Sequence, residues 1–160
     1  SRALDRKGIP TMAISRRSNN NTGTAELLEA LGRVALFSGL PKKTMQQIAN
    51  MCHRHTFVAG DEIVTQGDRS GRFYMIVSGN AEVHVNGHVV NMLGPGQHFG
   101  EYAVIDREPR TASVTATNDV LAYSLASITL RPLLKEEPEI TYRLLLNACE
   151  RLRAMQSTLG

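Results

Sequence analysis

The feature that most constrains this chain is a series of short β-rich segments between residues 56 and 125, most of them separated by glycine-bearing turns. Within the series, Val83 and Val85 alternate with polar residues up to Asn86-Gly87, a dipeptide typical of a tight hairpin. The segments predicted as strands are 56–58, 62–64, 73–77, 81–85, 89–93, 111–117 and 120–125. Many short strands at this spacing are typical of an antiparallel sandwich, jelly roll or barrel-like roll.

Helical periodicity lies on both sides of this region. Before it, Thr24 is predicted as the N-cap of one helix, and Pro41 suits the first turn of a second. After it, Ser127 is predicted to cap a short helical segment. Pro138 then opens a longer helix with one apolar stripe, formed by Ile140, Leu144, Leu145, Ala148, Leu152 and Met155. The predicted fold class is therefore α+β, an antiparallel β-roll of the jelly-roll kind with N-terminal and C-terminal helices.

Length and charge indicate one domain with a basic extension. A chain of 160 residues is long enough for an independent core, and its two cysteines exclude a disulfide scaffold or a four-cysteine zinc site. No apolar run approaches the roughly 20 residues that a membrane span requires. Residues 1–21 carry five basic residues and one acidic residue, whereas the rest of the chain carries 13 basic and 14 acidic residues. We therefore expect a basic flexible tail or linker at 1–23 and one folded domain at 24–160.

The segment 99–112 carries the chemistry. Gly100 precedes a few helix-compatible residues, and such a turn presents free backbone N–H groups that suit an anion. Arg110 can hold a phosphate through two parallel charge-assisted hydrogen bonds, and Thr111 adds a hydroxyl. The carboxylate of Glu101 is a good acceptor for a sugar hydroxyl. A carboxylate for ribose and an arginine for phosphate together indicate a nucleotide site, and a short phosphate-binding-cassette helix is predicted within this segment.

This segment closely resembles the phosphate-binding cassette of cyclic nucleotide-binding domains, as in bacterial catabolite activators, cyclic-nucleotide-dependent kinases and cyclic-nucleotide-gated channels. A second stretch, 63–79, resembles the glycine-bearing strand–turn–strand signature of the same family. The likeness extends over residues 27–155. Tyr102 departs from the pattern, because the family usually has an aliphatic residue at that place. Two motifs in the right order and at the right separation are far more specific than a lone glycine motif.

The resemblance implies a role for each residue of the cassette. Glu101 and the backbone of Gly100 would bind the ribose 2′-hydroxyl, and Arg110, Thr111 and the amide of Ala112 would bind the cyclic phosphate. The apolar wall of the cavity would come from Phe99, Met75 and Val77, and the cover over the base from Leu152, Arg153 or Met155. The favoured ligand is cAMP, with cGMP as the alternative, and no cofactor or metal is implied.

A site of this kind breaks no bond, so the resemblance implies a cytoplasmic regulatory domain for signal transduction, or the cytoplasmic part of a membrane protein, and not an enzyme. We expect the last helix, hinged at Pro138, to be mobile without nucleotide and docked over the base with it. The effector would be a domain of the parent protein or a partner protein. No DNA-binding element is expected in this chain, and a weak homodimer through the apolar stripe is a further expectation.

Other interpretations stay open from the sequence alone. A cupin-like metal enzyme would use the histidines, which are His53, His55, His84, His88 and His98, although no acidic residue follows His55 at the spacing typical of cupins. A degenerate roll would make only protein contacts. Independently of these, Arg110 could be a structural arginine bridged to Asp106 or Glu108, and Glu101 could only cap a helix.

Overall fold

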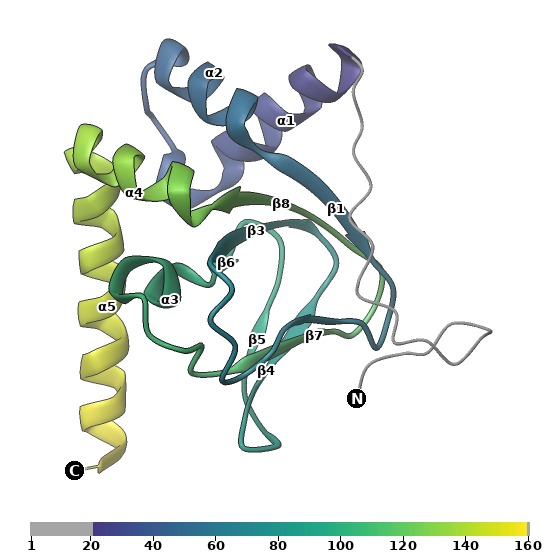
Figure 1. Ribbon diagram of the computed structural model, residues 1–160, viewed down its shortest axis with the longest axis vertical. Helices are drawn as coiled ribbons and strands as arrows, with labels where there is room; N and C mark the ends of the chain where they lie inside the picture. Colours follow the sequence, from purple (N-terminus) through teal and green to yellow (C-terminus); the bar gives the residue numbers. More distant parts are fainter. Residues whose placement is uncertain (1–20, 160) are drawn as a thin grey trace.

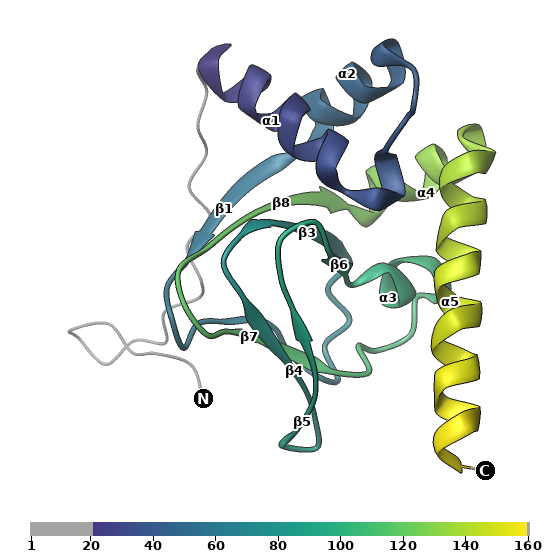
Figure 2. The ribbon, with the colours of Figure 1, turned by 180° about the vertical axis from the view of Figure 1, so that it is seen from behind.

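The computed structural model describes residues 21–159, which form two four-stranded sheets and five α-helices (Figures 1 and 2). The helical elements are α1 (Asn21–Arg33), the 3₁₀-helix η1 (Ala35–Phe37), α2 (Lys42–Met51), α3 (Glu101–Asp106), α4 (Ser127–Glu136) and α5 (Pro138–Leu159). The strands are β1 (His53–Phe57), β2 (Glu62–Val64), β3 (Arg72–Ser78), β4 (Ala81–Val85), β5 (His88–Leu93), β6 (His98–Phe99), β7 (Ser113–Ala116) and β8 (Val120–Ala126). This architecture confirms the predicted α+β roll.

The strands form a roll whose interior is apolar. One sheet has the order β1-β8-β3-β6 and the other β2-β7-β4-β5, with antiparallel neighbours throughout. Successive side chains of a strand point to opposite faces. On β3, Tyr74 and Ile76 therefore join the core between the two sheets, whereas Phe73 and Met75 join the core under the helices. Each sheet thus has a defined inner face.

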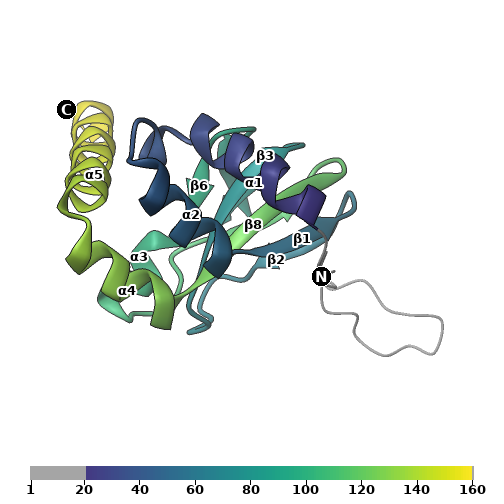
Figure 3. The same ribbon diagram turned by 90° about the horizontal axis from the view of Figure 1, so that it is seen from above.

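The helices cover the outer face of the β1-β8-β3-β6 sheet. Seen from above, α1 and α2 cross this sheet, while α5 stands beside the roll (Figure 3). Leu31, Ile48, Phe73, Leu125 and Ile140 are at most 1% exposed in the core between helices and sheet. Burial of each such side chain stabilises the fold by roughly 1.5–3 kcal/mol, as an upper estimate. This core holds the helices against the roll.

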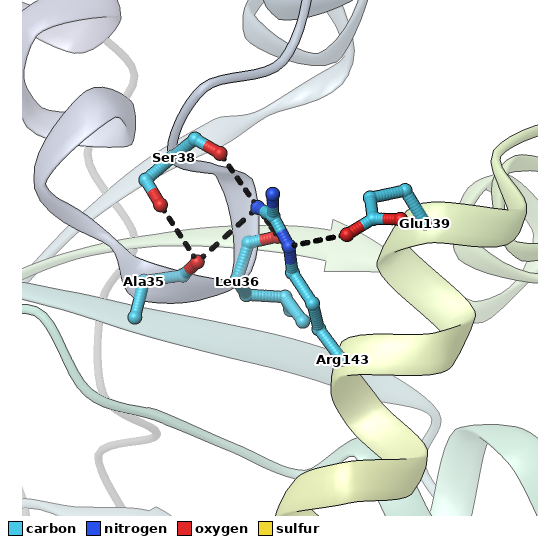
Figure 4. Close-up of polar contacts among 5 residues, drawn as sticks. All are labelled: Ala35, Leu36, Ser38, Glu139 and Arg143. Carbon is cyan, nitrogen blue, oxygen red and sulfur yellow. Dashed lines mark hydrogen bonds and ion pairs between the residues drawn. The ribbon is translucent and has the colours of Figure 1, made fainter.

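The first half of α5 is fixed to η1 by one arginine. Arg143 Nη1 donates hydrogen bonds to the carbonyl oxygens of Ala35, Leu36 and Ser38 at 3.4, 3.1 and 2.6 Å (Figure 4). Its Nε lies 3.3 Å from Glu139 Oε1, one turn earlier on α5. Three carbonyl groups at the end of a short helix thereby gain a donor.

The second half of α5 is exposed. Up to residue 157, Leu144 is the last buried residue of the helix, and Leu145, Leu152 and Met155 are 57–61% exposed. The predicted apolar stripe therefore packs on the domain only at its beginning. Within residues 21–159, no helix combines the length and the apolar character that a membrane span requires.

The element boundaries differ from the predicted ones most at α1 and β1, and by one or two residues at β3, β5, β7 and β8. Helix α1 begins at Asn21 and not after Thr24, because several residues of the N-capping class follow one another there and the pattern does not single out one of them. Strand β1 begins at His53, three residues before the predicted start. The two-residue strand β6 and the helix η1 were not predicted, since both are shorter than any reliable period. Of the basic tail or linker predicted at residues 1–23, residues 21–23 belong to α1, and residues 1–20 lie outside the described residues.

Candidate functional site

The cassette begins where Gly100 joins β6 to α3. Its φ of +93° lies in the left-handed region, which suits glycine. A Cβ atom at this position would lie 2.5 Å from the carbonyl oxygen of Arg72 and 2.9 Å from Arg110 Nη1. Strand β6 is aligned with β3 through the pair Tyr74 and Phe99, whose rings stack at 5.2 Å. A glycine is therefore required to bring the start of α3 against the guanidinium of Arg110.

Arg110 is a buried cation that has no acidic hydrogen-bond partner within residues 21–159. The residue is 5% exposed, and its Nη2 donates to the carbonyl oxygen of Arg72 at 2.8 Å. Its backbone N–H donates to the carbonyl oxygen of Asp68, also at 2.8 Å, which fixes the residue between two loops. Among the residues that the structure describes, Arg110 Nε is the one buried side-chain nitrogen or oxygen without a hydrogen-bond partner. Such orphaned donors are rare, because each costs about 1–3 kcal/mol.

Burial lowers the pKa of Arg110 but leaves the guanidinium charged at neutral pH. Desolvation lowers the pKa of the guanidinium from its ordinary value, and the nearby Tyr74, Asp68 and Glu101 oppose this shift. An arginine remains charged at neutral pH under these conditions. The structural alternative is not formed: within the described ion pairs, neither Asp106 nor Glu108 is bound to Arg110. The free Nε of a buried cation is suited to an anion.

Glu101 is a buried carboxylate with a partner on each oxygen. Its residue is 3% exposed, Oε2 lies 3.3 Å from His98 Nδ1, and Oε1 lies 3.6 Å from Arg151 Nη1. Burial raises the pKa of Glu101, but the hydrogen bond and charge of His98, a backbone hydrogen bond and the charge of Arg151 outweigh it. The pKa therefore lies below the ordinary value. Glu101 is thus an ionised acceptor at neutral pH.

A cavity of about 130 Å³ connects these groups. Its polar wall comes from the cassette, and its apolar wall comes mainly from the second sheet, through Val64, Val83, Leu93 and Val114. The predicted residues that line it together are Phe99, Gly100, Glu101, Arg110, Thr111 and Ala112. The arrangement offers a cationic donor at one place and a carboxylate at another, within one apolar hollow.

Five predicted residues lie elsewhere. The prediction that Met75 and Val77 wall the cavity is wrong: both belong to the core under the helices, because odd-numbered residues of β3 point away from the roll interior. Leu152, Arg153 and Met155 are exposed and do not line the cavity, so their contact with a base stays a prediction.

Three residues of the site were missed by the sequence reasoning. His98 and Arg151 bind Glu101, and Tyr102 OH accepts a hydrogen bond from Arg151 Nη1 at 3.1 Å. The guanidinium carbon of Arg151 also lies 5.4 Å from the centre of the Tyr102 ring. Two of these residues could have been found from the sequence. His98 stands three residues before Glu101, and Tyr102 departs from the residue type that is usual at its place in the cassette. Nothing local in the sequence pointed to Arg151, 50 residues away.

The histidines are not gathered around one point. In the described part of the chain, no group of three or more His, Cys, Asp or Glu residues could hold a metal ion. His55 is buried and lies 2.6 Å from Ser124 Oγ, and His84 pairs with Glu82 on the same strand at 3.3 Å. The hydroxyl of Ser124 also accepts a hydrogen bond from Arg72 Nη1 at 3.0 Å. These are structural roles.

Comparisons with known proteins bear on the same residues. The family model described as the cyclic nucleotide-binding domain matches residues 54–137. Over 119 residues, the chain is 35% identical to the cAMP-dependent protein kinase regulatory subunit of Yarrowia lipolytica, with 72% of this chain and 32% of that subunit covered. It is 32% identical to the cAMP-dependent protein kinase type II regulatory subunit of Drosophila melanogaster, with 83% of this chain and 36% of that subunit covered.

A solved structure gives the same indication in three dimensions. The crystal structure of the Thermus thermophilus catabolite activator protein is similar with a TM-score of 0.70 and 28% sequence identity. The match covers 78% of this chain and 61% of that one. The chain spans about a third of the length of the two kinase subunits.

Proposed function

The chain belongs to the cyclic nucleotide-binding domain family, and on that premise we propose that it is a regulatory domain whose cassette binds cAMP. The family predicted from the cassette is thereby confirmed. The observation that carries the proposal is the buried guanidinium of Arg110, whose Nε has no partner and which lines the same cavity as Glu101. A charged donor held in this way is suited to an anionic ligand that enters the cavity.

The phosphate of the nucleotide would be bound by Arg110. The hydrogen bond to the carbonyl of Arg72 occupies Nη2 and sets the plane of the guanidinium. A phosphate oxygen at Nε would satisfy the orphaned donor through a charge-assisted hydrogen bond. Thr111 and Ala112 follow Arg110 along the cavity wall, where a hydroxyl and an amide would complete the phosphate site.

The ribose would be bound by Glu101. Because the pKa of this carboxyl is lowered, it is ionised at neutral pH and accepts hydrogen bonds only. A 2′-hydroxyl is a donor of the right kind, whereas a second anion would be repelled. The separation of a carboxylate from an arginine within one cavity therefore favours a ligand with a hydroxyl near one phosphate.

cAMP is proposed as the main ligand in preference to cGMP. Both kinase relatives are described as cAMP-dependent. Thr111 can offer its hydroxyl to the phosphate or to the amino group of a guanine. A single contact of this kind is worth only about 0.5–1.5 kcal/mol, so we propose modest selectivity.

Binding is proposed to act on α5 through Arg151. A cavity of about 130 Å³ is smaller than the roughly 300–1,000 Å³ typical of small-ligand sites. Arg151 lines it and holds both Glu101 and Tyr102. Entry of a nucleotide would displace Arg151 from the carboxylate and so shift α5, which Pro138 separates from α4. Leu152, Arg153 and Met155 would then move over the base.

The relatives suggest what such a domain regulates. They are regulatory subunits and transcription regulators and not enzymes, and two of them regulate a kinase by name. We propose that this domain controls an effector, in its own parent protein or in a partner such as a kinase catalytic chain. The exposed apolar residues of α5 are available for that effector or for a weak homodimer.

Calorimetric titration of the chain with cAMP, cGMP and 5′-AMP tests the proposal. We expect saturable one-to-one binding of cAMP, weaker binding of cGMP, and far weaker binding of 5′-AMP, whose open phosphate carries more charge. Glu101→Gln should weaken cAMP binding while the fold remains. Absence of a saturable response to either cyclic nucleotide at millimolar concentration would overturn the proposal and favour a roll that makes only protein contacts.

A further inference from the structure

We infer that His98 positions the carboxylate of Glu101 and thereby sets the preference of the site for ribose over 2′-deoxyribose. This inference rests on the proposed function of the cassette. The contact is between buried groups: the side chains of His98 and Glu101 are 7% and 4% exposed, and His98 Nδ1 lies 3.3 Å from Glu101 Oε2. Because an ionised carboxylate only accepts, Nδ1 is the donor.

The imidazole of His98 cannot readily turn away. Its backbone belongs to β6, which is paired with β3 opposite Met75. Its ring lies 5.4 Å from the ring of Phe73, which is fully buried. The pairing of β6 with β3 and the packing of the imidazole against a buried ring hold the Nδ1 donor in place. The Glu101 oxygen that it contacts is held with it.

The other partner of Glu101 is held far less firmly. Arg151 has a side chain that is 42% exposed, and it lies on the half of α5 that is exposed to solvent. Its distance to Oε1 is 3.6 Å, so this is an ion pair and not a short hydrogen bond. The two oxygens therefore differ: Oε2 keeps a fixed donor, and Oε1 has an exchangeable one.

Because only Oε2 has a fixed partner, the orientation of the Glu101 carboxylate is set by His98. When Arg151 leaves, His98 still holds Oε2, and Oε1 becomes available as an acceptor for the ribose 2′-hydroxyl. Without His98, the buried carboxylate would rotate to satisfy its oxygens elsewhere and would present no fixed acceptor. The other charges that face this pair are those of Arg151 from α5 and Arg110 from the loop after α3.

The test combines two variants of His98 with two ligands. His98→Phe keeps an aromatic ring beside Phe73 and removes the donor, whereas His98→Asn restores a side-chain N–H near the place of Nδ1. Calorimetry measures the affinity of each protein for cAMP and for 2′-deoxy-cAMP, and thermal unfolding without ligand confirms that each variant is folded.

For the unchanged protein we expect about tenfold tighter binding of cAMP than of 2′-deoxy-cAMP. His98→Phe should weaken cAMP binding about fivefold or more and 2′-deoxy-cAMP binding less than about twofold, because the latter has no hydroxyl to lose. His98→Asn should recover most of the cAMP affinity.

Equal losses for both ligands in His98→Phe, or no loss for either, would overturn the inference and leave the cAMP site standing. Failure of the unchanged protein to bind either ligand would instead overturn the proposed function, and the inference with it.

Discussion

Replacement of Arg110 by methionine separates a ligand-binding arginine from a structural one. The variant removes the hydrogen bond from Nη2 to the carbonyl of Arg72, whose net contribution is about 0.5–1.5 kcal/mol. It also removes a desolvated cation with an orphaned Nε, a penalty of about 1–3 kcal/mol in the absence of ligand. The two terms oppose each other. We therefore expect the free energy of unfolding without nucleotide to stay within about 1.5 kcal/mol of the unchanged protein or to rise.

In contrast to its small effect on stability, Arg110→Met should greatly weaken the binding of cAMP. Loss of one partner of a desolvated charge pair costs about 2–5 kcal/mol, which corresponds to at least a thirty-fold weaker affinity for cAMP. Urea unfolding without ligand and calorimetric titration with cAMP measure the two quantities on the same preparation. Arg143→Met serves as the matched control, because three carbonyl groups lose their donor and stability should fall.

The result that refutes this reasoning is the opposite pattern. If Arg110→Met lowered the free energy of unfolding by about 3 kcal/mol or more and left the affinity for cAMP unchanged, Arg110 would be a structural residue. The cavity would then have no assigned anion-binding group.

Three further predictions follow from other parts of the structure. Arg107, the C-cap that follows α3, has a φ of +62° and is exposed, so Arg107→Gly should raise the free energy of unfolding by about 0.5–1 kcal/mol in urea, and a loss of stability would contradict this account of its backbone. Burial, followed by the charges of Arg72 and His53, lowers the pKa of His55 from 6.5 to about 4; because the unfolded chain takes up this proton at higher pH, stability should fall by up to about 2 kcal/mol from pH 7 to pH 5. His55→Gln should flatten that dependence, and an unchanged slope would show that other groups cause it. Hydrogen exchange of residues 139–157 should change when cAMP is added, and equal protection in both states would leave α5 without a part in the relay.

The parts of the molecule that the sequence predicted are those that are local along the chain. The roll followed from short alternating segments and the Asn86-Gly87 turn, which forms the β4–β5 hairpin with Asn86 at a φ of +52°. The polar residues of the cassette followed from their spacing within one short segment. Such features depend on residues that are close in the sequence, so the sequence pattern alone predicts them.

The parts that were missed depend on distant segments. Whether Met75 faces the cavity or the helices is decided by the pairing of β3 with β6 and β8, and a shift by one residue reverses the answer. Arg151 reaches Glu101 because α5 lies beside α3 (Figure 1), which no period within either helix could indicate. The role of His98 likewise depends on Phe73, which comes from another strand.

The central claim is that a cyclic phosphate binds to the orphaned donor of Arg110, and the most direct measurement is the side-chain Nε–H signal of this residue by NMR. The signal is assigned by its absence in Arg110→Met and followed as cAMP is added. The account predicts a saturable shift of the Arg110 Nε–H signal, with slower exchange with water, at the same affinity that calorimetry gives. An Arg110 Nε–H signal that stays unchanged while cAMP binds would contradict it, because the phosphate would then be held elsewhere.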